Sequence, residues 1–157
     1  MARELWLLRH GEAEPHDARP DEERRLTPRG ERQSRDAGAA LAKLGVELAA
    51  AYTSPRVRAL DTARLACESL GADPEVVDAL TGGWDADGAR ELLAGHEDGD
   101  AILVVGHEPD LSQVVHDLTG GRVNLKKGGI ATVRVDGARA ELFVLLRPKE
   151  TEAIAAA

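Results

Sequence analysis

The sequence twice places a histidine beside a glycine at the end of an apolar run. These runs are Leu5–Gly11 (LWLLRHG), which contains His10, and Ala101–His107 (AILVVGH). A neutral imidazole nitrogen can attack phosphorus and form a covalent phosphohistidine, which water then hydrolyses. Because the carboxyl ends of parallel strands lie along one edge of a sheet, where ligands bind in α/β folds, we expect His10 and His107 to meet there.

A third segment adds positive charge to the same edge. Thr53-Ser54-Pro55 ends a short apolar stretch, and the helical pattern that follows carries Arg56 and Arg58 in its first turn. A transferring phosphoryl group spreads negative charge over its oxygens, which guanidinium groups and helix N-terminal amides can bind. The residue types therefore indicate a phosphate site that contains a nucleophile, and this scheme needs neither a metal ion nor a cofactor.

Strands and helices alternate in the expected order. Apolar runs and turn residues predict strands at 4–8, 48–54, 74–80, 101–105, 130–135 and 140–146. Helical periodicity and capping residues predict helices at 27–45, 56–70, 88–94 and 109–118, with a frayed Ala-rich helix from residue 151. This alternation predicts a single α/β domain over residues 1–157, in three layers, with a mixed and mainly parallel sheet between helices.

Composition excludes several other classes. The formal charge of −8 disfavours nucleic acid and membrane surfaces as partners, because both attract a basic face. The N-terminal apolar run is too short for a signal or a membrane span, since Arg9 interrupts it. The single cysteine, Cys67, cannot form an internal disulfide. We therefore expect a cytoplasmic protein.

Three motifs in this order, LLRHGEA, TSPRVRALDTA and VVGHEPDL, resemble the histidine phosphatase superfamily. The chain is short and is most similar to the SixA-type phosphohistidine phosphatases of that superfamily. The resemblance implies a phosphoglycerate mutase-like fold without a large cap insertion. It also implies that His10 is the nucleophile and that Arg9, Arg58 and His107 complete the phosphate pocket. The family's SP-x-x-R-A pattern selects Arg58 over Arg56, which becomes a rim residue.

The chain departs from the family at the general acid. Many relatives that act on small molecules carry a glutamate soon after the third strand, where this sequence reads DALTGGWDADG, with Asp85 and Asp87 as candidate substitutes. Losing a positioned acid costs roughly 10²–10⁴-fold when the leaving group is an alkoxide. Transfer of a phosphoryl group from one imidazole to another depends less on a general acid, because donor and acceptor have similar chemistry. We therefore favour phosphohistidine on a protein as the substrate. A small phosphomonoester is the first alternative, and a non-catalytic phosphate-binding module is the second.

Several further residues are candidates for accessory roles. Ser54 belongs to the second motif, and Glu12 can orient His10, assist water or pair with a loop arginine. Lys126, followed by Lys127, lies in a glycine-containing basic turn that is either solvated or steers an anionic partner to the site.

The remaining polar clusters have simpler interpretations. The run from 21 to 25 is expected to be a solvated loop, with Arg24 and Arg25 at most rimming the cleft. The other histidines are expected to be structural or exposed. A metal site is disfavoured by spacing that matches no zinc helix motif; its candidate ligands are His107, Glu108, Asp110 and His116.

Overall fold

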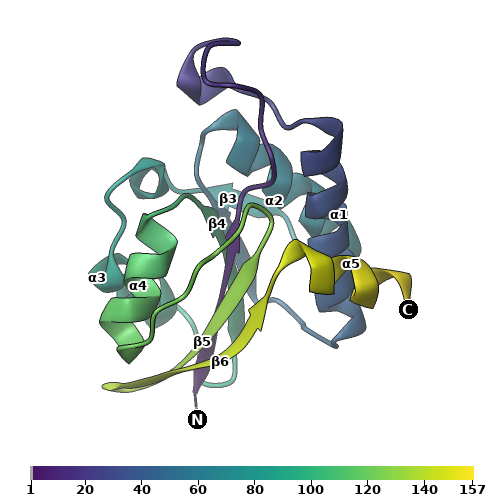
Figure 1. Cartoon of the computed structure of the whole chain (residues 1–157). Helices are drawn as coiled ribbons and strands as arrows, with labels where there is room; N and C mark the ends of the chain where they lie inside the picture. The colour runs from purple at the N-terminus through teal and green to yellow at the C-terminus, as the bar shows by residue number, and fades with distance from the viewer. Residues whose placement is uncertain (1) are drawn as a thin grey trace.

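The computed structural model describes residues 2–157, which form one six-stranded sheet with helices on both faces (Figure 1). In chain order the elements are β1 (Arg3–Arg9), η1 (Asp21–Glu23), α1 (Pro28–Lys43), β2 (Ala50–Thr53), α2 (Val57–Leu70), β3 (Pro74–Val76), η2 (Asp78–Thr81), α3 (Ala86–Ala94), β4 (Ala101–Gly106), α4 (Asp110–Thr119), β5 (Ile130–Asp136), β6 (Arg139–Leu146) and α5 (Pro148–Ala156).

The sheet has the strand order β3-β2-β4-β1-β5-β6, and its first four strands run parallel. Strands β5 and β6 complete it in antiparallel pairings. Arg9 lies opposite Gly106 and Thr53 lies opposite Val105, so β1, β4 and β2 end side by side. This register confirms the predicted mixed sheet, and it brings the segments that follow these three strands to one edge.

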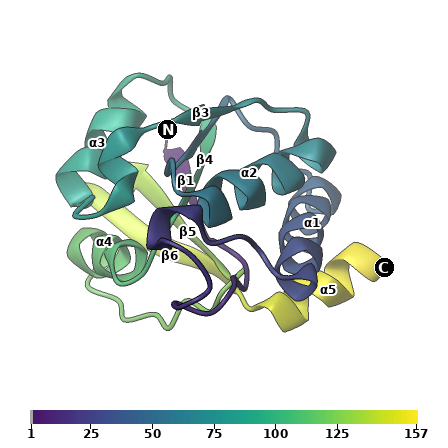
Figure 2. The same ribbon diagram turned by 90° about the horizontal axis from the view of Figure 1, so that it is seen from above.

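Helices cover both faces of the sheet. Seen from above, α1, α2 and α5 lie on one side of the strands, and α3 and α4 lie on the other (Figure 2). Side chains of a strand alternate between faces, so Leu5 and Leu7 pack toward α3 and α4, whereas Trp6 and Leu8 pack toward α1 and α2. Strand β4 is buried along its whole length, as its uninterrupted apolar sequence predicts.

The helix ends follow the expected local chemistry. Thr27 caps α1, because its hydroxyl oxygen accepts a hydrogen bond from the Gly30 amide at 3.1 Å, and Pro28 opens the helix. At the C-terminal end of α2, Gly71 adopts the left-handed conformation with a φ of 65° and ends the helix. A side chain at Gly38 would place its Cβ 2.1 Å from the Ala66 carbonyl oxygen, so glycine allows α1 to approach α2 closely.

The C-terminal segment differs from the expectation. The helix begins at Pro148 rather than at residue 151, and it packs against α1 instead of fraying. Arg147 and Glu150 form a capping arrangement at its start, and Lys43 of α1 donates a hydrogen bond to the Ala155 carbonyl. Tertiary packing therefore supplies the order that the Ala-rich composition did not indicate. No helix in residues 2–157 combines the length and the apolarity needed to cross a membrane.

Candidate active site

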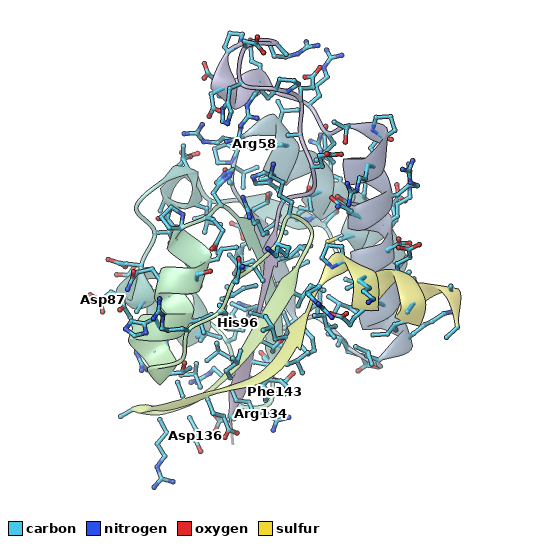
Figure 3. All side chains as sticks on the ribbon, viewed as in Figure 1. Arg58, Asp87, His96, Arg134, Asp136 and Phe143 are labelled. Carbon is cyan, nitrogen blue, oxygen red and sulfur yellow. The ribbon has the colours of Figure 1, made fainter. Side chains whose placement is uncertain are left out.

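The aligned strand ends bring the predicted histidines together. The His10 and His107 rings lie with their centroids 5.2 Å apart, and the His10 amide donates a hydrogen bond to the Gly106 carbonyl at 3.2 Å. Ser54 follows β2 on the same edge, and its amide donates to the Val105 carbonyl at 3.1 Å. Arg58, in the first turn of α2, lies at the upper end of the sheet in Figure 3.

His10 is held in a single tautomer. Its Nδ1 lies 2.8 Å from the carbonyl oxygen of Gly11, which can only accept a hydrogen bond, so Nδ1 carries the proton. Burial lowers the pKa of His10 to about 3, and the positive environment of Arg58 and Arg9 acts in the same direction. At neutral pH the ring is therefore uncharged, and Nε2 has a free lone pair.

His107 is held by Ser54. Its Nε2 lies 2.8 Å from Ser54 Oγ, which already accepts a hydrogen bond from the Arg56 amide at 3.2 Å. Burial lowers the pKa of His107 to about 4, with Arg58 contributing. Within residues 2–157 the Ser54 hydroxyl donates to no oxygen acceptor, so we assign its proton to the bond with Nε2 of the neutral ring. Nδ1 of His107 then carries a hydrogen, and within residues 2–157 that buried atom has no partner.

The two arginines also keep buried donors free. Nη1 of Arg9 donates to the Leu125 carbonyl at 3.0 Å, and Nη1 of Arg58 donates to the Asp21 carbonyl at 2.7 Å. The Nε atom of each arginine is buried and has no hydrogen-bond partner in the described chain. Burial lowers the pKa of both groups, yet a guanidinium stays charged at neutral pH. Buried donors without partners are costly unless a ligand satisfies them.

Asp21 corrects the expectation of a solvated loop at 21–25. Its carboxylate accepts a hydrogen bond from Arg58 Nη2 at 3.2 Å and another from Arg24 Nε at 3.0 Å, and it also pairs with Arg56. Arg24 is only 7% exposed. Burial acts to raise the pKa of Asp21, but Arg58 and Arg24 outweigh it and hold that pKa below its ordinary value. The loop therefore folds over the arginines and neutralises part of their charge.

Thr62 joins the loop that follows His10 to the helix that carries Arg58. Its Oγ1 accepts a hydrogen bond from the Gly11 amide at 3.1 Å and donates to the Arg58 carbonyl at 2.7 Å. Gly11 has to be small here, because a Cβ would lie 2.5 Å from the carbonyl oxygen of Gly30. The sequence motifs alone did not assign a role to Thr62. Its position one helical turn after Arg58 was the feature that could have indicated a contact with the Arg58 backbone.

The accessory candidates take different positions. Glu12 accepts a hydrogen bond from the Thr27 hydroxyl at 2.8 Å, and it forms no ion pair with an arginine within residues 2–157. Asp85 caps α3 by accepting from the Gly88 amide at 2.9 Å, and Asp87 lies in the first turn of α3, well away from Arg58 in Figure 3. Lys126 is exposed on the loop that precedes β5. The structure therefore brings Ser54 to the histidine pair and engages Asp85 elsewhere.

The other candidates lie away from this site. His16 and His116 are exposed, and His96 contacts Tyr52 through a 2.7 Å hydrogen bond. Cys67 is buried in α2, where burial raises the pKa of its thiol to about 11. Within residues 2–157 no three side chains among His, Cys, Asp and Glu are grouped so that they could hold a metal ion.

The chain is similar to known proteins in both sequence and structure. Residues 5–82 match the histidine phosphatase superfamily (branch 1). The chain is 37% identical to an uncharacterized protein of Picosynechococcus sp., in an alignment that covers 93% of this chain and 97% of the relative. The structure of the protein histidine phosphatase SixA complexed with tungstate superimposes with a TM-score of 0.84 at 27% identity, covering 94% of this chain and 98% of that one. The structure of a putative phosphohistidine phosphatase SixA from Nakamurella multipartitia superimposes with a TM-score of 0.77 at 26% identity, and the alignment covers 94% of this chain and 97% of that one.

The fold and these matches define the protein as a phosphatase. The chain belongs to the histidine phosphatase superfamily, and its architecture is of the SixA type. The phosphoglycerate mutase-like fold expected from the sequence is confirmed.

Proposed function

We propose that this protein removes the phosphoryl group from phosphohistidine on a protein, through a covalent intermediate on His10. The observation that carries the proposal is the state of His10. Nδ1 is bound to the Gly11 carbonyl, and a pKa of about 3 leaves Nε2 unprotonated beside His107 at neutral pH. A buried imidazole with one free lone pair, surrounded by cations, is suited to attack an anionic phosphorus centre.

The proposed pocket residues provide matching donors for the phosphoryl oxygens. The unpartnered N–H groups are Nε of Arg9, Nε of Arg58 and Nδ1 of His107. All three belong to residues that lower the pKa of His10, and the His107 ring centroid lies 5.2 Å from that of His10. Hydrogen bonds that strengthen as charge spreads over the equatorial oxygens would stabilise the transition state. A SixA structure that contains tungstate, a tetrahedral oxyanion, supports this use of the pocket.

The first step exchanges one phosphorus–nitrogen bond for another. His10 Nε2 donates its electron pair to phosphorus as the bond to the substrate imidazole breaks and the substrate ring takes back that bond's electrons. A proton taken from solvent at the other ring nitrogen lets the substrate leave as neutral imidazole. His10 becomes a cation, and the Gly11 carbonyl stabilises it at Nδ1. Water then attacks phosphorus, which releases phosphate and restores neutral His10.

The carboxylates around the site favour this substrate over an alkoxide ester. Asp21 contacts the pocket arginines, and they hold its pKa below the ordinary value, so it is a poor proton donor at neutral pH. Asp85 is engaged in the cap of α3. A phosphohistidine tolerates this lack of an acid because its leaving ring accepts a proton from solvent. We expect the enzyme to act without a metal ion in the cytoplasm.

Phosphate release in the presence of EDTA tests the proposal. The substrates are a protein carrying phosphohistidine and a panel of small phosphomonoesters, and the enzymes are wild type, His10→Ala and the exposed-histidine control His116→Ala. We expect preference for the phosphoprotein, retained in His116→Ala and lost in His10→Ala. Preference for one monoester would move the function to small-molecule metabolism. Absence of turnover on every substrate would favour a phosphate-binding module.

A further inference from the structure

A basic hollow of about 430 Å³ lies beside the proposed phosphate pocket. Its cationic lining residues come from the end of β1, the start of α1, the loop before β5 and the start of α5, and they are Arg9, Arg29, Lys126, Lys127, Arg147 and Lys149. Glu12 is the single acidic residue in this lining. Such a concentration of positive charge is unusual for a chain whose formal charge is −8.

Most of this positive charge is available to a partner. Arg29, Lys126 and Lys127 are exposed and form no ion pair within the described residues. Arg147 is already paired with Glu150 at 2.8 Å, so it adds less. Lys149 is exposed in the first turn of α5, and it is the smallest of the influences that lower the pKa of Glu150. Arg29, Lys126 and Lys127 therefore face solvent without a counter-ion among the described residues, and Lys149 adds a fourth exposed charge.

The backbone fixes this hollow relative to the nucleophile. The Gly128 amide donates to the carbonyl oxygens of both Arg9 and His10, at 3.0 Å each, and the Arg9 amide donates to the Gly129 carbonyl at 3.1 Å. Arg9 Nη1 also donates to the Leu125 carbonyl. The loop that carries the two lysines is thus bonded to the residues on which the proposed chemistry depends. Arg9 contributes to the hollow and, in the proposed mechanism, to the phosphate pocket.

We propose that the hollow binds an acidic segment, rich in Asp or Glu, of the protein whose phosphohistidine enters the pocket. This inference rests on the proposed function. The cations other than Arg9 are exposed and come from three chain segments, which suits several carboxylates on a flexible chain rather than one compact anion in a buried cradle. The acidic remainder of the protein repels extended polyanions such as nucleic acid, so a short acidic stretch fits the local charge better.

Two charge-matched triple variants test the proposal. Arg29→Gln/Lys127→Gln/Lys149→Gln removes three charges from the hollow, and Arg64→Gln/Arg122→Gln/Arg139→Gln removes three exposed charges outside its lining. Each enzyme is given two phosphohistidine peptides that differ only in an acidic or an Asn/Gln flank, and the free phosphoramidate ion. We expect the hollow variant to raise KM for the acidic peptide about tenfold at low salt, with kcat and phosphoramidate turnover unchanged.

A binding measurement separates this proposal from the phosphatase proposal. Fluorescence anisotropy with the unphosphorylated acidic peptide requires no turnover, and the hollow variant should lose most of the binding that the control variant keeps. Equal binding of the acidic and Asn/Gln peptides, or equal losses in both triple variants, would overturn the docking site. Tighter binding of single-stranded DNA with the same number of charges would overturn the choice of partner. Docking without phosphohistidine turnover would instead refute the proposed function alone.

Discussion

His10 and His96 both have a ring neighbour, at opposite ends of the parallel strands, and they differ in which of their ring nitrogens are engaged. His96 lies near the amino end of β4, where its Nε2 contacts the Tyr52 hydroxyl at 2.7 Å and its Nδ1 lies 3.7 Å from Asp100 (Figure 3). His10 follows the carboxyl end of β1, and within residues 2–157 its Nδ1 is hydrogen-bonded to the Gly11 carbonyl whereas its Nε2 has no hydrogen-bond partner. Both rings are well packed, so packing alone does not distinguish them. The free ring nitrogen and the surrounding arginines make His10 the candidate for chemistry.

The largest expected effect is the loss of His10. His10→Ala should lower turnover by at least about 10⁴-fold, because no other group replaces the nucleophile, and thermal unfolding should show that the fold persists. His96→Phe is the matching change at the other end of the sheet. It should leave turnover within about twofold and cost about 1 kcal/mol of unfolding free energy, through the lost hydrogen bond. Comparable loss of turnover in both variants would contradict the distinction between the two sites.

The next effect concerns the two arginines at the start of α2. Arg58→Ala should reduce kcat/KM about 10³-fold, because it removes a donor to the developing charge on phosphorus. Arg56→Ala should reduce kcat/KM less than about tenfold, since we place it at the rim. Steady-state kinetics on one phosphohistidine substrate measures both. The reverse order would show that the guanidinium groups exchange the roles assigned to them.

The low pKa values of His10 and His107 predict that the fold is sensitive to acid. The pKa is about 3 for His10 and about 4 for His107, whereas an unfolded histidine titrates near 6.5. Below about pH 6.5 the unfolded chain binds protons that the folded chain excludes, so stability falls as pH drops toward 4. Each histidine contributes a slope of about 1.4 kcal/mol per pH unit in that window. Urea denaturation should show a shallower slope for His107→Gln, and an unchanged slope would contradict the shift.

Asp21 has a smaller expected effect. Asp21→Asn removes the charge that Arg24, Arg56 and Arg58 share, and we expect about tenfold lower turnover because Arg58 is then less well oriented. The side chain is 42% exposed, so solvent screening limits the stability loss to about 1 kcal/mol. Asp17→Asn is an exposed control from the same loop. Tighter phosphate binding with undiminished turnover would instead show that Asp21 competes with the substrate.

The sequence predicted the residues of the site whose positions depend on strand ends. His10 and His107 follow apolar runs that are long enough to be recognised as buried strands, and parallel pairing then brings them together. The hydrogen-bond partners of the two histidines are harder to predict from the sequence. The carbonyl that accepts from His10 belongs to the next residue, Gly11, whereas the Ser54 contact with His107 depends on the register of β2 against β4.

Asp21 and α5 could not be predicted in the same way. Asp21 lies 37 residues from Arg58 in sequence, and its charged neighbours in the chain are typical of a solvated turn. Only the folded path of the loop brings its carboxylate to the arginines. The start of α5 similarly depends on packing against α1 and on the Arg147–Glu150 contact, which outweigh the polar sequence at that point.

The most direct test of the account is to locate the phosphoryl group during turnover. The enzyme is mixed with excess phosphohistidine substrate and quenched in alkali, which preserves phosphorus–nitrogen bonds, and peptide mass spectrometry then identifies the modified residue. We expect one phosphate on His10, which is absent from His10→Ala and accumulates as fast as the substrate is consumed in the first turnover. Phosphate on another residue, or full turnover with no phosphoenzyme on this timescale, would contradict it.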